Sequence, residues 1–210
     1  MEYRPTVPPA VPHDASDEML MVRYQRGDRH AFAELVRRHH RRVYNFALLQ
    51  LRSERAAEDA AEDAFRALVQ NAARFKHEAR FSTWLYRIVH EVCLKALASG
   101  QAGRVEPSAE PTDALLLETE ESGVGRHSAP GLERAKGASV IAASVIAALD
   151  ELPNDQRAVL LLKEVAQLPL RDIAEVTDTT EHAVRTRLRY ALDRLQRVLS
   201  GFEEYARALR

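Results

Sequence analysis

Arginine side chains gather near the carboxyl end of the chain in a pattern that suits nucleic-acid binding. At helical spacing, Arg185, Thr186 and Arg189 share one face. Guanidinium groups bind guanine edges bidentately and grip phosphate oxygens. The pattern fits a DNA-reading helix and, about equally well, an ordinary amphipathic helix with a solvated basic face. Within thirteen positions only one acidic residue, Asp193, accompanies the five arginines Arg185, Arg187, Arg189, Arg194 and Arg197.

The other residue types that carry chemistry form no catalytic or metal-binding pattern in the sequence. Cys93 is the only cysteine and lies among apolar residues at helical spacing, which favours a small core side chain over a nucleophile or ligand. His39 and His40 are adjacent, so on a helix they point about 100° apart and cannot chelate one ion together. No Gly-rich phosphate loop appears. We therefore expect a protein that is not an enzyme and that holds no metal and no cofactor.

The elements around the arginines predict a helix-turn-helix domain. A short helix, a tight turn and a longer basic helix place the first turns of the second helix in the DNA major groove. Thr179 or Thr180 should cap that second helix. The predicted order is a helix over 155–166, a turn at 168–170, a short helix through 176, a turn at 177–180, and a long helix from about 181.

The first part of the chain predicts a helical bundle with an acidic ridge. Asp28 should cap a helix that ends near Leu51, Ser53 the next, and Ser82 or Thr83 a further helix that stops at Gly100. The second of these helices places its apolar residues Phe65, Leu68 and Val69 inward. Its outer face is acidic, with Glu58, Asp59, Glu62 and Asp63.

Composition and charge divide the chain into two domains. The net charge of −1 over 210 residues points to no partner, but residues 100–138 carry seven acidic and four basic groups and most of the glycines. We predict an all-α protein with two small helical domains joined by a flexible acidic linker. Lacking a signal peptide and any apolar run of about 18 residues, it should be cytoplasmic, without membrane insertion. The expected parts are a disordered tail at 1–13, domains at 14–99 and 139–199, the linker at 100–138, and a carboxyl-terminal tail at 200–210.

Motifs in both domains resemble the extracytoplasmic-function (ECF) group of bacterial sigma factors in the sigma-70 family. In the first domain the resemblance rests on AFAELVRRHHRRVYNFA, AEDAAEDAF at 57–65 and FSTWLYRI at 81–88. In the second it rests on LeuPro at 152–153, Arg157, AspIleAla at 172–174 and ValArgThrArgLeu at 184–188. The resemblance covers roughly residues 17–98 and 139–199, and implies a non-catalytic subunit that directs RNA polymerase to promoters.

The family resemblance also implies roles for particular residues. The first domain would bind core RNA polymerase and open the promoter, and the second would bind the upstream promoter element; an anti-sigma factor is the expected regulator. The core polymerase residues are Asp59, Glu62, Asp63 and Phe65; the downstream-element residues are Arg80, Ser82, Thr83, Trp84, Arg87 and Glu91; the upstream-element residues are His182, Arg185, Thr186, Arg187, Arg189 and Tyr190. Trp84 is expected to be mostly structural.

Departures from the family pattern keep a second function open. Glu91 stands where the family often has Asn, and residues 98–100 lack the usual basic side chains. A carboxylate beside phosphates would weaken contact with the opened strand. The alternative function is a sigma-like regulatory or decoy protein that binds an anti-sigma factor or polymerase without opening promoters. A one-component regulator is a weaker alternative, because the first domain shows no pattern of a ligand pocket.

Overall fold

The computed structural model describes residues 15–77, 79–100 and 144–208, without the side chains of 198, 199 and 201–208. The predicted amino-terminal tail and nearly all of the predicted linker lie outside these residues. The described part is helical throughout, with no strand among its residues, as the all-α prediction required. Its helices are α1 (Asp17–Gln25), α2 (Arg29–Leu51), α3 (Glu54–Asn71), the 3₁₀ turn η1 (Ala72–Arg74), α4 (Phe81–Ala98), α6 (Asn154–Glu164), α7 (Leu170–Val176) and α8 (Glu181–Ala208).

The predicted caps hold at most helix starts. The Asp28 carboxylate accepts from the backbone N–H groups of His30 and Ala31, and the Ser53 hydroxyl accepts from that of Ala56. Gly27 has a φ of 95°, a left-handed conformation that glycine adopts without strain. Gly27 thus follows the end of α1, and Asp28 and Ser53 start α2 and α3 where the sequence predicts.

The start of α4 differs from the prediction. Arg80 stands at the cap position and makes no capping bond through its side chain, while Ser82 and Thr83 lie inside the first turn. The helix begins earlier because Phe81 is fully buried and lies one turn before the buried Leu85, so it continues the inward face of α4. One acceptor for the exposed helix end comes instead from another helix, since the Glu18 carboxylate accepts from the Phe81 N–H at 3.0 Å.

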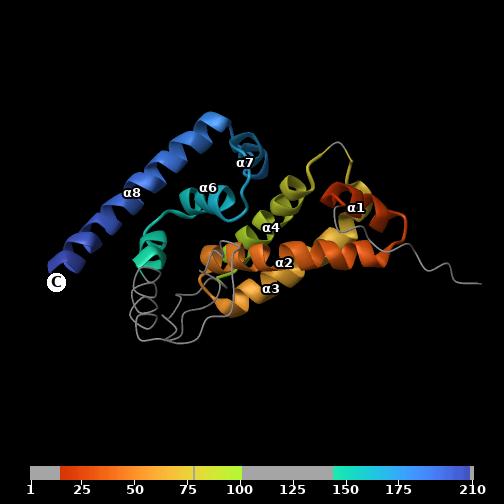
Figure 1. Cartoon of the computed structure of the whole chain (residues 1–210), viewed down its shortest axis with the longest axis horizontal. Coiled ribbons are helices and arrows are strands. Elements are labelled where there is room, and N and C mark those ends of the chain that lie inside the picture. Colours follow the sequence, from red (N-terminus) through yellow and green to blue (C-terminus); the bar gives the residue numbers. More distant parts are fainter. Residues whose placement is uncertain (1–14, 78, 101–143, 209–210) are drawn as a thin grey trace, which may run out of the picture.

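Two further expectations need correction. Val69 is 42% exposed, so the inward face of α3 consists of its alanines with Phe65 and Leu68. The last helix runs to Ala208, through most of the segment predicted to be a carboxyl-terminal tail. Figure 1 shows α8 as one long helix that projects away from the rest of the molecule.

The two helical groups pack against each other. In Figure 1, α6 and α7 lie over the bundle of α2, α3 and α4, and α4 contacts α7 while α2 contacts α6. One continuous cluster of buried apolar side chains runs from α1–α4 into α6, α7 and α8. The two predicted domains are therefore joined by a common core in this arrangement.

Candidate nucleic-acid interface

The basic helix α8 presents its predicted polar face to the surface. Val184 and Ala191 are fully buried, and Leu188 packs against the core. The opposite side exposes Arg185 and Arg189. The helix therefore has one buried apolar side and one exposed basic side, and a DNA duplex could approach the basic side. Of the remaining predicted residues, His182 and Tyr190 are exposed, while Thr186 and Arg187 are half-buried.

The turn between α7 and α8 fixes the direction of α8. Asp178 has a φ of 49°, and the Thr179 N–H donates to the Ala174 carbonyl at 2.9 Å. The Thr180 hydroxyl accepts from the Ala183 N–H at 3.2 Å, which makes Thr180 the predicted cap. The helix-turn-helix geometry therefore follows from local bonds as well as from packing.

Ion pairs distinguish the arginines of α8. Arg185 pairs with Glu181 one turn earlier at 3.1 Å, and both side chains are exposed. Such a pair contributes little in water, so Arg185 can exchange Glu181 for a DNA partner. Arg187 instead pairs with Asp155 of α6 at 3.1 Å and helps to hold α8 on α6. The Arg189 guanidinium lies 5.3 Å from the centre of the Tyr190 ring, in cation–π contact.

The residues predicted for the downstream element surround the start of α4. Arg80 is exposed and Ser82 is half-buried. Trp84 packs against Phe75 and Phe81, with ring centres 5.2 and 6.3 Å away. Trp84 is therefore part of the packing of this region, as expected.

Two other residues of α4 are less available than the sequence suggests. Thr83 is only 6% exposed, and its hydroxyl donates to the Asp172 carboxylate of α7 at 2.7 Å. Contact between Thr83 and DNA therefore requires α7 to separate from α4. Arg87 pairs with Glu91 at 3.7 Å on the exposed side of the helix, so Glu91 lowers the positive charge there.

The acidic ridge on α3 lies between two hollows. One, of about 400 Å³, is bounded by His40 and Tyr44 of α2 and by Glu58 and Glu62. Burial, together with the charges of Glu54 and Glu58, raises the pKa of Tyr44. The ridge therefore offers negative charge beside an aromatic side chain.

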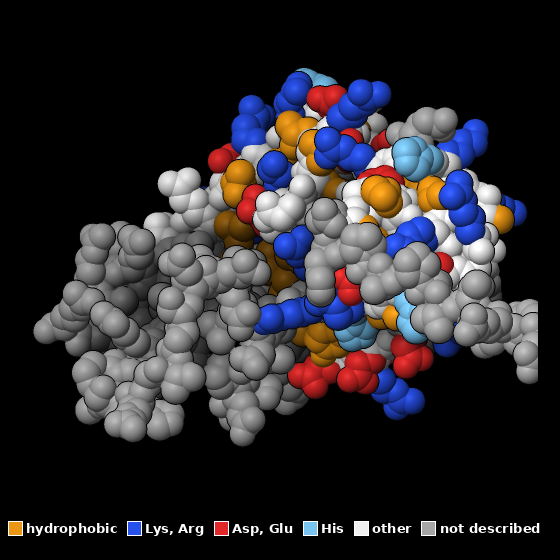
Figure 2. All heavy atoms as spheres, turned by 45° about the vertical axis from the view of Figure 1, so that its right-hand side comes forward, with side chains coloured by type: hydrophobic (Ala, Val, Ile, Leu, Met, Phe, Trp, Pro, Cys, Tyr) orange, Lys and Arg blue, Asp and Glu red, His pale blue; other side chains and the backbone are white. Residues whose placement is uncertain are grey.

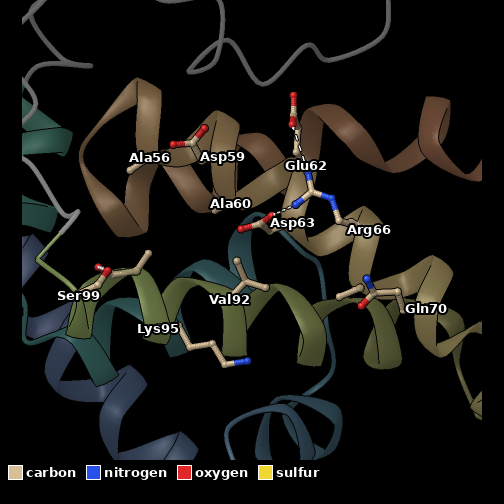
Figure 3. A pocket seen from close by; sticks show the side chains of 12 residues that line it. Ala56, Asp59, Ala60, Glu62, Asp63, Arg66, Gln70, Val92, Lys95 and Ser99 are labelled. Atoms are coloured by element: carbon tan, nitrogen blue, oxygen red, sulfur yellow. Dashed lines mark hydrogen bonds and ion pairs between the residues drawn. The ribbon is translucent and has the colours of Figure 1, made fainter.

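The second hollow is a groove of about 630 Å³ between α3 and α4. Figure 3 shows Arg66 between Glu62 and Asp63 on α3, with Val92 and Lys95 of α4 and Ser99 at the end of α4 across the groove. Phe65 is 9% exposed, and its ring stacks on that of His40 of α2 with the ring centres 6.1 Å apart, so it belongs to the packing beneath the ridge. Asp59, Glu62 and Asp63 are exposed together, as predicted.

A buried arginine joins the two helical groups. Arg157 of α6 is 2% exposed and donates to the carbonyls of Leu149 at 2.9 Å, Leu152 at 2.8 Å and Gln50 at 3.3 Å. Burial, and the nearby charge of Arg52, lower its pKa to about 10. Gln50 belongs to α2, so the guanidinium satisfies carbonyls on both sides of the contact.

Basic and acidic side chains gather on different parts of the described surface. Figure 2 shows Lys and Arg side chains over much of the described surface on one face, with acidic side chains gathered along its lower edge. Cys93 is buried, and burial raises the pKa of its thiol to about 12, as expected for a core side chain. Among the described residues there is no group of three metal-ligating side chains, and no helix long and apolar enough to cross a membrane.

Comparison with known proteins identifies the family. The family models for Sigma-70 region 2 and Sigma-70, region 4 match residues 35–102 and 142–195. The ECF RNA polymerase sigma factor SigM of Mycobacterium tuberculosis is 32% identical over 197 residues, which cover 94% of this chain and 91% of that protein. The chain belongs to the ECF group of the sigma-70 family. The RNA polymerase sigma-H factor of Pseudomonas aeruginosa is 30% identical over 188 residues, 87% of this chain and 93% of that protein.

Solved structures share the fold of this sigma factor. CnrH, in complex with the cytosolic domain of CnrY, aligns with a TM-score of 0.62 and 20% identity over 89% of this chain and 99% of that one. RpoE, in complex with the anti-sigma factor NepR from Bartonella quintana, gives a TM-score of 0.57 and 18% identity over 80% and 96%. As a family member, the protein is a non-catalytic subunit that binds core RNA polymerase and directs transcription initiation at specific promoters.

Sequence reasoning missed the residues that join elements distant in the chain. The sequence marks Arg157 only as a family residue, and its polar neighbours at 154–156 give no sign that its side chain is buried and hydrogen-bonded. The bond from Thr83 to Asp172 and the bond from Phe81 to Glu18 span 89 and 63 residues. No spacing rule predicts such contacts.

Proposed function

We propose that this sigma factor reads the upstream promoter element through the exposed face at the start of α8. Arg185 and Arg189 would contact base edges or phosphates, and Thr186, His182 and Tyr190 would lie beside them. The exposure of both arginines opposite the buried Val184 is the observation that carries this assignment. Arg187, which pairs with Asp155, would add only a backbone contact after it leaves that partner.

Binding to a selected promoter tests the upstream assignment. The target promoters are first obtained by selecting duplexes that the holoenzyme binds from a randomised library. Arg185→Ala or Arg189→Ala should each lower specific affinity by about 1 to 3 kcal/mol, if the residue makes a bidentate base contact. Arg197→Ala is a matched control, since Arg197 is exposed, lies about two turns beyond Arg189 on the same helix and donates to the Asp193 carbonyl. Unchanged affinity in both variants would refute the assignment.

The acidic ridge of α3 is the proposed docking surface for core polymerase. Asp59, Glu62 and Asp63 present carboxylates without burial, so they can pair with basic side chains of a partner at a small desolvation cost. Arg66, which pairs with Glu62 and Asp63, would move to the edge of the contact with polymerase and free both carboxylates for the partner. Phe65 would hold the ridge in place from the core.

The loop before α4 and the start of α4 are the proposed downstream-element reader. Arg80 and Ser82 flank Phe81 in the chain, and the Phe75, Phe81 and Trp84 rings pack together beside them; an unstacked base would rest here and phosphates would be held by Arg80. Thr83 and Arg87 would join only after Asp172 and Glu91, respectively, release them.

An anti-sigma factor is the proposed regulator. The support is that the RpoE structure with the same fold was solved with the anti-sigma factor NepR. The proposed location is the cytoplasm, where core polymerase and promoter DNA are found. Proteins that co-purify with the tagged full chain from its own organism test this part, and recovery of polymerase subunits alone would contradict a stable regulator.

Transcription with purified core enzyme tests the whole assignment. The full chain should give transcripts that start at one position on the selected promoter, and a template with the upstream element scrambled should give none. Core binding without any transcript would favour the decoy function, in which Glu91 prevents opening. In that case Glu91→Asn would be expected to restore transcripts.

A further inference from the structure

Helix α1 lies before the part of the chain that the region 2 family model matches, and none of the residues to which the resemblance assigns a role lies in it. Its neighbour α2 holds it firmly. The Asp17 carboxylate accepts from Arg38 at 3.1 Å and contacts the His39 ring nitrogen at 2.7 Å. Leu20 and Met21 are fully buried in the core. Helix α1 is therefore a fixed support rather than a loose leading segment.

From this support, two side chains reach the loop that precedes α4. At one end of the loop, the Gln25 amide donates to the carbonyls of Ala72 at 2.8 Å and Phe75 at 3.0 Å. At the other end, the Glu18 carboxylate accepts from the Phe81 N–H at 3.0 Å. These three bonds, two from Gln25 and one to Glu18, hold both ends of the segment that leads from α3 to α4.

The Glu18 contact supplies what α4 lacks. The first N–H groups of a helix have no partner within the helix, and the side chain of Arg80 provides none. A carboxylate at that end also interacts favourably with the helix dipole. Glu18 therefore caps α4 from another helix and fixes where the first turn of α4 begins.

We propose that Glu18 and Gln25 are positioning residues for promoter opening, because from α1 they fix both ends of the loop that presents Arg80 and Ser82 to the unstacked strand. The inference rests on the proposed assignment of this loop to the downstream element. A segment whose two ends are already held loses less conformational entropy when it captures a base than one whose ends are free. Removing the bonds of either side chain should weaken that capture while the helices stay folded.

The test compares two binding reactions of the same holoenzyme. The first probe is a fluorescent single-stranded oligonucleotide with the non-template strand of the selected promoter around its downstream element. The second is a duplex that contains only the upstream element. Glu18→Ala and Gln25→Leu should each lower affinity for the single strand about 10-fold, with affinity for the upstream duplex and for core enzyme unchanged. Glu18→Gln keeps an accepting oxygen, so its affinity for the single strand should stay within about 2-fold of that of the parent protein.

Met19→Ala is the matched control, because Met19 lies on the same helix and is 52% exposed. Single-strand affinity unchanged in both Glu18→Ala and Gln25→Leu would overturn the inference, as would an equal fall in affinity for core enzyme and for the upstream duplex. Arg80→Ala separates this inference from the proposed function. If Arg80→Ala has no effect on single-strand affinity, the loop assignment fails; if it has its effect and the Glu18 and Gln25 variants have none, only the positioning role fails.

Discussion

Replacement of Arg157 by alanine should destabilise both helical groups at once. The side chain makes three hydrogen bonds from a charged donor to carbonyls, each worth roughly 2 kcal/mol. The alanine variant no longer pays the cost of burying the Arg157 charge, and the lowered pKa of about 10 puts that cost at about 3 kcal/mol. This gain offsets part of the loss of the hydrogen bonds. The net loss in free energy of unfolding is therefore about 3 kcal/mol. With a denaturant slope of about 3 kcal/mol per molar urea, the unfolding midpoint should fall by about 1 M.

Trp84 makes the measurement specific. It is the only tryptophan and lies in α4, whereas Arg157 lies in α6. Because one buried cluster joins the two groups, the urea transition followed by Trp84 fluorescence should shift with that followed by circular dichroism. Arg157→Lys should lose most of the stabilisation that Arg157 provides, since one ammonium group cannot reach the three carbonyls that the planar guanidinium reaches. Arg171→Ala, an exposed change on α7, is the control.

The outcome that refutes this reasoning is a Trp84 transition that does not move in Arg157→Ala. The two helical groups would then unfold independently, and the hydrogen bond from Arg157 to the Gln50 carbonyl would contribute nothing to the stability of α1–α4. A change in the free energy of unfolding below about 0.5 kcal/mol, the usual range for surface substitutions, would equally contradict the magnitude.

Three further outcomes are expected. Reversing the charges of Glu62 and Asp63 to Lys should abolish holoenzyme formation in a pull-down with core enzyme and leave the circular dichroism spectrum unchanged; unfolding would instead assign these residues a structural role. Thr83→Val with Asp172→Ala should loosen the contact between α4 and α7 and increase the distance between spin labels on the two groups; an unchanged distance distribution would show that this hydrogen bond contributes nothing to closure. Cys93 should resist alkylation by iodoacetamide at pH 8 until the protein unfolds, because its thiol is buried and its raised pKa of about 12 keeps it protonated, and rapid labelling of the native protein by mass spectrometry would contradict this.

Local sequence rules predicted the helices well. Asp28 and Ser53 cap where hydroxyl and carboxylate side chains precede apolar periods, and the turn before α8 follows from its threonines. The same rules misplaced the start of α4, because a hydroxyl residue suggests a cap only when the residues before it are free of the core. Phe81 is not free of it, and its burial moved the helix start before Ser82.

The candidate surfaces were predictable to the extent that they are properties of one helix face. The ridge of α3 and the outer face of α8 each follow from a period of 3.6 residues. The pairing of Arg187 with Asp155 and the bond from Thr83 to Asp172 depend on which helices lie opposite, and a single sequence does not contain that information. For this reason the sequence predicts that Thr83 is available to DNA, whereas the packing of α7 on α4 buries it.

The closed contact between the two helical groups has a consequence for how partners compete for this protein. A partner that binds only the separated form meets an apparent affinity reduced by the fraction of molecules that are separated. If closure is favoured by about 1.4 kcal/mol, that reduction is about 10-fold. A partner that accepts the closed form meets no such reduction. Substitutions at Asp172, which remove the bond to Thr83, can therefore shift the balance between a partner that requires the separated form and one that accepts the closed form.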